Sequence, residues 1–102
     1  MLSSKKRLSR SEFDFVFKNG VSLSGENINF KSIDHNKEQI SRFSFVVSKK
    51  VAKKAIKRNL IKRRGYAAVR NLYKNIKNGI DGIFFFKKGA EKLSYKEIED
   101  EI

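Results

Sequence analysis

The order of apolar and polar residues predicts that the chain begins with a short helix. Phe13 and Phe17 lie one helical turn apart, and Ser9 with Glu12 forms a candidate capping box just before them. We therefore expect a helix over residues 10–18. The two phenylalanines are either core residues or partly exposed rings, and exposed aromatic rings can serve as platforms on which the unpaired bases of a nucleic acid stack.

The next residues alternate between apolar and polar types, which is typical of a half-buried strand. Val21 and Leu23 belong to one stretch and Ile28 and Phe30 to another, and Gly25 between them suggests a bend or a bulge. This region is therefore predicted to form either one bent strand or two strands.

Two more strands are predicted further along the chain. Phe43, Phe45 and Val47 occupy alternate positions after a polar loop at residues 34–39. We expect this strand and the preceding strand region to share one face of a sheet. Residues 80–86 are apolar at nearly every position, which predicts an interior strand that is covered on both faces.

Between these strands the pattern predicts a long amphipathic helix over residues 51–77, which contain no Pro and only one Gly. Its buried stripe is expected to consist of Ile61, Gly65, Ala68, Val69, Leu72 and Ile76. The opposite side is expected to be a cationic ridge with one aromatic residue, made of Asn59, Arg63, Tyr66, Arg70 and Lys74.

The last predicted element is a short helix that opens at a second candidate capping box, Ser94 with Glu97, and continues to Ile98 and Ile102. The order of elements is then αβββαβα if the first strand region forms two strands. A chain of 102 residues with 39% hydrophobic content and nine Phe can build one core but not two. We therefore expect residues 1–102 to form a single domain.

Charge narrows the range of partners, because 24 Lys and Arg residues against 11 Asp and Glu residues leave a net charge of +13. Residues 49–64 contain nine of the basic residues, and no Asp or Glu occurs from residue 41 to residue 80. This concentration favours a polyanion, either nucleic acid or an anionic membrane surface. The long helix lacks Trp and has few bulky apolar residues in its first half, which disfavours a membrane.

Other functional classes are disfavoured by what the sequence lacks. The chain has no Cys and a single His, so no thiolate or histidine metal site is expected. The carboxylates have no evident partner base, and Glu12 is expected to be a helix cap, Glu26 a surface strand residue and His35 an exposed loop residue. No apolar stretch approaches the roughly 18 residues of a membrane-spanning helix. We expect a soluble cytoplasmic protein that is not an enzyme by itself.

Three segments of the chain carry a family resemblance. They are KKRLSRSEFDFVFKNG, then SFVVSKKVAKKAIKRNLIKRRGYAAVR, and, after a hydrophobic strand, LSYKEIEDEI. In this order they resemble the protein subunit of bacterial ribonuclease P, the enzyme whose RNA subunit removes the 5′ leader from precursor tRNA. The middle segment is the most specific, since Arg58, Asn59, Lys62 and Arg63 match the family's Arg-Asn-x-x-Lys-Arg pattern.

The chain departs from the family pattern at three positions. Leu60 and Tyr66 stand where the family usually or often has Arg, and Arg64 and Arg70 are expected to compensate. Lys31 stands where some members carry an aromatic residue. The first two departures remove two expected cationic contacts, and the third removes one candidate stacking contact.

The resemblance implies an α+β fold, a two-layer α/β sandwich of the ribosomal protein S5 domain 2-like type with a left-handed βαβ crossover. It implies that the protein itself binds no cofactor, because the Mg²⁺ ions belong to the RNA subunit. The implied partners are ribonuclease P RNA and precursor tRNA, and no protein partner is expected. The protein then assists removal of the leader without supplying a catalytic residue.

The resemblance also implies two sets of binding residues. The set that contacts the RNA subunit is Lys53, Lys54, Lys57, Arg58, Asn59, Lys62, Arg63, Arg64 and Arg70. The set that contacts the single-stranded leader, in a cleft between the first helix and the sheet, is Phe13, Phe17, Lys31 and Lys49. Two alternatives remain, a general RNA-binding or ribosome-associated module and a nuclease that acts without RNA.

Overall fold

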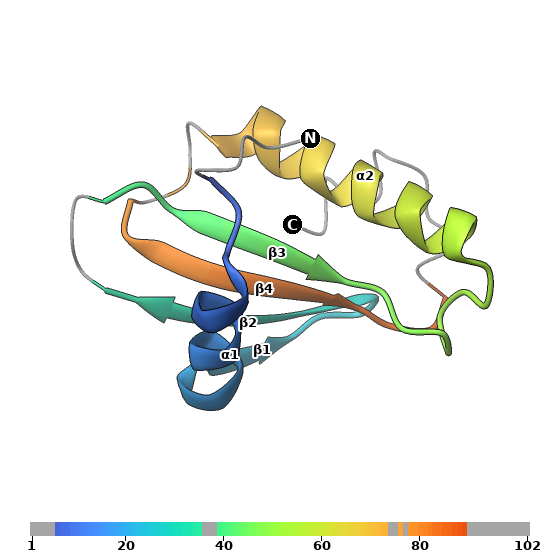
Figure 1. Cartoon of the computed structure of the whole chain (residues 1–102), viewed down its shortest axis with the longest axis horizontal. Coiled ribbons are helices and arrows are strands. Elements are labelled where there is room, and N and C mark those ends of the chain that lie inside the picture. Colours follow the sequence, from blue (N-terminus) through green and yellow to red (C-terminus); the bar gives the residue numbers. More distant parts are fainter. Residues whose placement is uncertain (1–5, 36–38, 74–75, 77, 90–102) are drawn as a thin grey trace.

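Two helices and four strands make up the part of the chain that the computed structural model describes, which is residues 6–35, 39–73, 76 and 78–89. The helices are α1 (Arg10–Asn19) and α2 (Ala55–Leu72). The strands are β1 (Val21–Ser24), β2 (Ile28–Asp34), β3 (Arg42–Val46) and β4 (Ile80–Phe86). Figure 1 shows the strands in one sheet, with α2 on one face and α1 on the other. We call these the α2 face and the α1 face.

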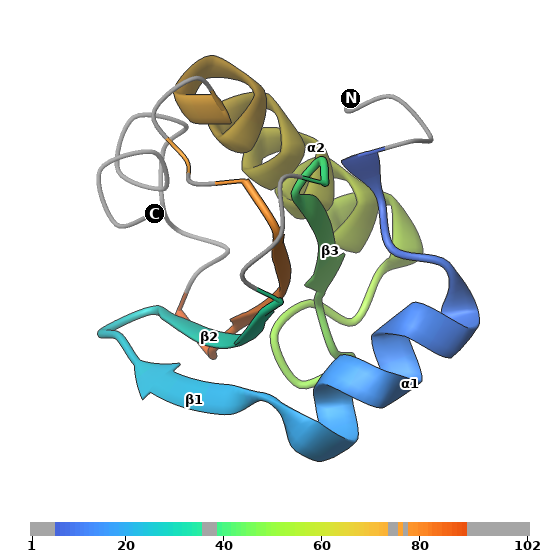
Figure 2. The same cartoon turned by 90° about the vertical axis from the view of Figure 1, so that its left-hand side faces the viewer.

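The sheet has the strand order β1-β2-β4-β3, in which β3 and β4 are parallel and the other neighbours are antiparallel. β4 lies between β2 and β3, which confirms the interior position predicted for residues 80–86, but Phe85 is only half-buried, so the strand is not fully covered on both faces. Figure 2 looks along β3 and β4 from their first residues, and the chain turns anticlockwise from β3 through α2 to β4. This is the left-handed crossover that the family resemblance implies, opposite in hand to most βαβ units.

α1 confirms the first predicted helix together with its capping box. The Glu12 amide donates to the Ser9 hydroxyl at 3.3 Å, and the Ser9 amide donates to the Glu12 carboxylate at 2.7 Å. These bonds satisfy two amide groups near the helix start that the helix itself leaves unpaired. Val16 is fully buried, and the Gly20 amide donates to its carbonyl at the end of the helix.

Residues 21–34 form two strands rather than one bent strand, so the described elements follow the order αβββαβ. Glu26 lies in the bend between β1 and β2, which corrects its prediction as a strand residue. Asp34 is the last residue of β2 and not part of the loop that the pattern places there. The helix predicted from Ser94 lies outside the described residues.

The main core lies between α2 and the sheet. Because side chains alternate along a strand, Phe43 and Phe45 of β3 and Phe84 and Phe86 of β4 all belong to the cluster that packs beneath α2. Gly65 lets the helix approach closely, since a Cβ atom at this position would lie 2.5 Å from the ring of Phe45. The helix and the aromatic rings therefore fit together only because that side chain is missing.

Tyr66 corrects the predicted division of α2 into a buried stripe and a cationic ridge. The pattern places Tyr66 on the ridge, but the residue is only 8% exposed, and its ring meets Phe45 edge-on at 4.7 Å between centroids. The aromatic cluster is wide enough to cover this side of the helix as well, so the prediction for Tyr66 is wrong. The predicted stripe is confirmed as buried at Ile61, Gly65, Ala68 and Val69.

α2 is shorter than the sequence pattern predicts, because it begins at Ala55 rather than near residue 51 and ends at Leu72 rather than near residue 77. The amides of Val51 and Ala52 both donate to the Ser48 carbonyl, at 3.1 and 3.2 Å, and both side chains are buried. A tight turn therefore occupies the positions expected for the first helical turn. The spacing of apolar residues cannot distinguish this turn from a first helical turn, since either structure would bury Val51 and Ala52.

Tyr73 fastens the end of α2 to the start of β3. Its hydroxyl donates to the Ser41 carbonyl at 2.6 Å, and the Ser41 hydroxyl accepts from the Ile80 amide at 3.0 Å. Burial raises the pKa of Tyr73 above its ordinary value of 10.0, so the phenol keeps its proton at neutral pH. The segment before α1 reaches the same place, with the Lys6 ammonium 4.2 Å from the centre of the Tyr73 ring.

Candidate nucleic-acid interface

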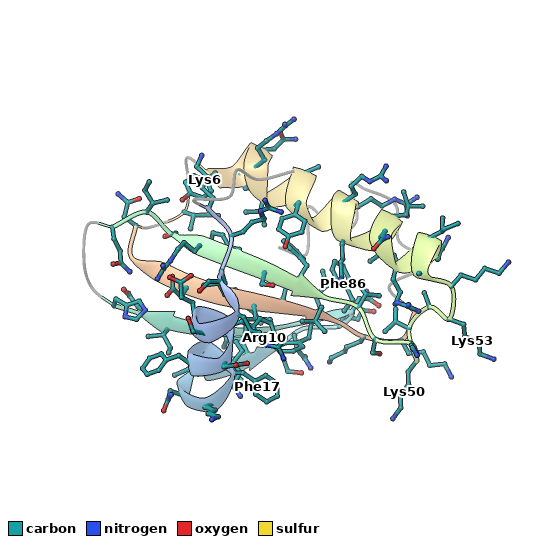
Figure 3. The ribbon with its side chains drawn as sticks, viewed as in Figure 1. Lys6, Arg10, Phe17, Lys50, Lys53 and Phe86 are labelled. Carbon is teal, nitrogen blue, oxygen red and sulfur yellow. The ribbon has the colours of Figure 1, made fainter. Side chains whose placement is uncertain are left out.

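A cationic surface covers α2 and the loop that precedes it. The residues predicted to bind an RNA subunit all lie there. Exposed members are Lys53, Lys54, Lys57, Asn59, Arg63 and Arg70, and half-buried members are Arg58, Lys62 and Arg64. Lys49 and Lys50 are exposed in the same loop. Figure 3 shows Lys50 and Lys53 pointing away from the ribbon at the end of the molecule where α2 begins.

The first turn of α2 adds the partial positive charge of a helix amino terminus to this surface. Lys54 occupies the N-cap position and makes no side-chain hydrogen bond to the first turn, which contains no acidic residue. Asp, Asn or Ser at the cap and an acidic residue in the first turn would stabilise the helix more. The sequence present here instead favours an anion from outside the protein, such as a phosphate.

Arg58 is used differently from the other cations of this surface. Its Nη1 group donates to the carbonyl of Ala52 at 3.0 Å and to the carbonyl of Lys53 at 2.7 Å. The guanidinium group therefore lies against the loop that leads into α2. Neither the charge pattern nor the family pattern distinguishes Arg58 from its neighbours in this way.

A groove of about 270 Å³ lies on the α1 face of the sheet. Phe17 of α1 and Phe85 of β4 line it together with residues of β1 and β2, namely Ser22, Leu23, Ser24, Asn29, Phe30 and Lys31. The family resemblance implies a cleft between the first helix and the sheet, and the groove lies at that place.

Three phenylalanines form an aromatic cluster, of which Phe17 and Phe85 line the groove, whereas Phe13 contacts Phe17 and is not among the lining residues. Phe17 is 50% exposed, and its ring stacks on Phe13 with 6.3 Å between centroids and meets Phe85 edge-on at 6.0 Å. Phe13 and Phe85 are half-buried. Aromatic rings that are fixed in place and still reach solvent are suitable platforms for unpaired bases. Phe17 therefore packs against the protein and also offers a free surface, so the two predicted roles are compatible.

Lys31 places a positive charge beside this aromatic surface. Its ammonium group lies 4.8 Å from the centre of the Phe17 ring, which is a cation–π contact. A nucleotide in the groove would meet an aromatic ring for its base and a cation for its phosphate. Lys49, the fourth residue predicted to bind the leader, is exposed in the turn after β3 and is not among the residues that line the groove.

Hydrogen-bonding groups form the rim of the groove on the β1 side. The Ser24 hydroxyl donates to the side-chain oxygen of Asn29 at 3.0 Å. The Lys87 ammonium donates to the Ser24 hydroxyl at 3.2 Å and to the Gly25 carbonyl at 2.6 Å. These bonds tie the turn between β1 and β2 to the end of β4, so this side of the groove is held in place.

A network of four polar side chains lies at the start of β3 and β4, and the sequence pattern does not predict it. The Arg42 guanidinium donates to both carboxylate oxygens of Asp81, at 3.0 and 2.7 Å, and also to Glu12 of α1. His35 Nε2 lies 3.0 Å from Asp81 Oδ2, which corrects the prediction that His35 is an exposed loop residue. The signal was Asp81 itself, because a carboxylate within an interior apolar strand needs a cationic partner.

This network does not form a metal site. Within the described residues, no group of three or more His, Cys, Asp or Glu side chains is placed to hold a metal ion. The carboxylates of Glu12 and Asp81 instead face Arg42, which joins α1 to the sheet. In the same part of the chain, no helix has both the length and the apolar character needed to cross a membrane.

Comparison with known proteins gives consistent results. A family model described as Ribonuclease P matches residues 2–102. The ribonuclease P protein component of Pseudanabaena sp. (strain PCC 6903) is 33% identical over 103 residues, which cover 100% of this chain and 89% of that protein. The ribonuclease P protein component of Finegoldia magna is 34% identical over 88 residues, which cover 86% of this chain and 75% of that protein. The solved ribonuclease P protein from Thermotoga maritima superposes with a TM-score of 0.81 at 25% identity and covers 93% of this chain and 89% of its own.

Proposed function

The chain belongs to the ribonuclease P protein family, and on that premise we propose that it binds ribonuclease P RNA and the 5′ leader of precursor tRNA at two separate surfaces. Members of this family are the protein component of the ribonucleoprotein endoribonuclease that matures the 5′ end of tRNA. The cationic surface of α2 would bind the RNA subunit, and the groove on the α1 face would bind the leader.

The observation that carries this proposal is the position of the two surfaces on opposite faces of one sheet. The cations lie on α2 and its preceding loop, whereas Phe17 and Lys31 line a groove on the α1 face. A protein with this arrangement can hold two RNA molecules at once. The two surfaces also differ in chemistry. The cationic surface of α2 suits the phosphates of a folded RNA, whereas the groove on the α1 face offers an aromatic ring as well as a positive charge, which suits an unpaired strand.

The proposed mechanism divides the work between protein and RNA. The RNA subunit would hold the Mg²⁺ ions that activate water for phosphodiester hydrolysis. The protein would neutralise phosphates on the RNA subunit and fix the leader beside it, so its contribution is positioning and charge. In this proposal the chain acts as a single domain in the cytoplasm, without a cofactor of its own and without a protein partner.

Cleavage assays with separated components test the proposal. We would measure removal of the 5′ leader from a precursor tRNA with the protein alone, with the cognate ribonuclease P RNA alone, and with both, at low Mg²⁺ and moderate salt. We expect cleavage with both components and little with either alone, because charge supplied by the protein replaces part of the cation requirement.

Two other outcomes would point to different functions. Cleavage by the protein alone would place the chemistry in the protein and support a nuclease that acts without RNA. Binding of the protein to ribonuclease P RNA with no change in cleavage would support a general RNA-binding or ribosome-associated module. Both results would contradict the assignment of the two surfaces.

A further inference from the structure

Arg58 points back along the chain, toward the loop before α2. One of its terminal nitrogens donates to two consecutive carbonyls, those of Ala52 at 3.0 Å and Lys53 at 2.7 Å. Hydrogen bonds from a charged donor are about twice as strong as bonds between neutral groups. The side chain is half-buried, so this contact is also shielded from water in part.

The loop that Arg58 contacts carries lysines on both sides of a buried anchor. Val51 and Ala52 are the anchor, with their side chains buried and their amides bonded to the Ser48 carbonyl. Two pairs of exposed lysines, at residues 49–50 and 53–54, flank it. In Figure 3, Lys50 from the first pair and Lys53 from the second extend from the loop into solvent.

A loop with four lysines needs a contact that holds it in one conformation. The four ammonium groups repel one another, and the N-cap residue Lys54 makes no capping bond to α2. Arg58 cannot cap the helix, because a guanidinium group has no acceptor for the free amides of the first turn, but it ties the backbone just before α2 to the helix itself. A binding surface that is already ordered loses less entropy when its ligand arrives.

We propose that Arg58 is a positioning residue, which holds the loop of residues 49–54 so that its lysines meet neighbouring phosphates of the RNA. Its main effect on binding then passes through those lysines and not through a phosphate contact of its own. The inference rests on the proposed function in one respect only, the identity of the RNA. The contact with the two carbonyls belongs to the free protein.

The test is a double-mutant cycle with a matched control on the same helix. We would measure binding of cognate ribonuclease P RNA to Arg58→Met, which keeps the aliphatic stem, and to Arg63→Met, which removes an exposed cation from α2. Each change would be made in the natural chain and in a background with Lys50→Ala and Lys53→Ala. Arg58→Met is expected to weaken binding about tenfold in the natural chain and about twofold in the lysine-depleted background, because coupled residues are not additive. Arg63→Met is expected to cost the same factor in both.

Salt dependence and hydrogen exchange supply two further measurements. In a plot of the logarithm of the RNA association constant against log[salt], Arg63→Met should reduce the steepness of the slope by the amount expected for about one phosphate contact. Arg58→Met should reduce it by the amount expected for about two contacts or more. In the free Arg58→Met protein, the amides of Val51 and Ala52 should exchange faster while those of β4 do not. Arg58→Lys, which keeps several donors and the charge, should remain within about twofold of the natural chain.

Three results would overturn the inference. They are equal losses for Arg58→Met in both backgrounds, a slope change no larger than that of Arg63→Met, and unchanged exchange at Val51 and Ala52. Failure of the proposed function would look different, because the natural chain would then bind ribonuclease P RNA no more tightly than an unrelated folded RNA of equal length. The exchange experiment would still decide whether Arg58 holds the loop.

Discussion

The two faces of the sheet use phenylalanine for different purposes. On the α2 face, Phe43, Phe45 and Phe86 are all at most 5% exposed and pack as a closed cluster. On the α1 face, Phe17 is 50% exposed even though it contacts two other rings. The first set contributes to the stability of the protein, and the second retains surface that a ligand can cover.

The difference arises from the helix that covers each face. α2 has 18 residues and lies close to β3 because Gly65 admits the ring of Phe45. α1 has only 10 residues and covers the sheet around Val16, while β1 and the end of β4 remain open beside it. Coverage by a neighbouring helix, and not the type of residue, therefore decides whether an aromatic side chain becomes core or binding surface.

The largest expected effect comes from removing an aromatic ring of the closed face. Phe45→Ala should lower the free energy of unfolding by about 3–5 kcal/mol, because it leaves a cavity beneath α2. Urea unfolding would measure this, with Phe17→Ala as the control from the open face, for which we expect a loss of about 1 kcal/mol. Similar losses for the two variants would contradict the comparison of the faces.

Gly65→Ala tests how closely α2 approaches the sheet. Helix propensity alone predicts a gain of about 1 kcal/mol for this change. A Cβ atom at this position would lie 2.5 Å from the Phe45 ring, so we expect a net loss of about 1–3 kcal/mol by urea unfolding. A more stable protein would mean that the helix is further from β3 than described.

Phe17→Ala tests the binding role of the open face. Loss of a stacking platform should weaken binding of precursor tRNA to the assembled ribonucleoprotein by about 1–3 kcal/mol and leave binding of mature tRNA, which lacks the leader, unchanged. Phe15→Ala is the matched control, because Phe15 is 55% exposed on the same helix but does not line the groove. Equal weakening for precursor and mature tRNA would assign Phe17 a packing role only.

The smallest expected effect concerns Lys31. Lys31→Gln should weaken precursor binding by less than about 1 kcal/mol and reduce its salt slope by about one, since a single phosphate contact is lost. Lys18→Gln, an exposed cation at the end of α1 that does not line the groove, is the control. Tighter binding by Lys31→Gln would show instead that the ammonium group shields the Phe17 ring from bases.

Local signals in the sequence were sufficient to predict most of the fold. Ser9 and Glu12 predicted the start of α1, and the apolar residues at 80–86 predicted the interior strand β4. The hand of the crossover came from the family resemblance, because the general rule for βαβ units predicts the opposite hand. The cations of α2 lie where the pattern placed them, since a charge run on a helix is rarely buried.

Within the candidate site, the family resemblance implied roles for Phe17 and Lys31 but did not indicate that the two side chains contact each other. Sequence patterns also treated Arg58 as one cation among several, and His35 as solvent-exposed. In each case the sequence does not reveal the contact partner. Phe17 and His35 contact residues that are distant along the chain, and the Arg58 side chain turns back toward residues that precede its helix. Charge and periodicity describe single positions, and they do not specify such pairs.

Sequence patterns were sufficient to predict the types of the described elements, most of the core residues and the cationic character of α2, because these depend on neighbours within a few residues. The burial of Tyr66, the pairing of Asp81 with Arg42 and the open part of the α1 face follow only from the packing of the folded chain. These outcomes depend on which helix and strand surfaces come into contact in the folded protein. The contacts are set by packing between elements that are far apart in the chain. The short length of α1 leaves part of one face of the sheet exposed to solvent, and the missing Cβ atom of Gly65 lets α2 cover the other face closely.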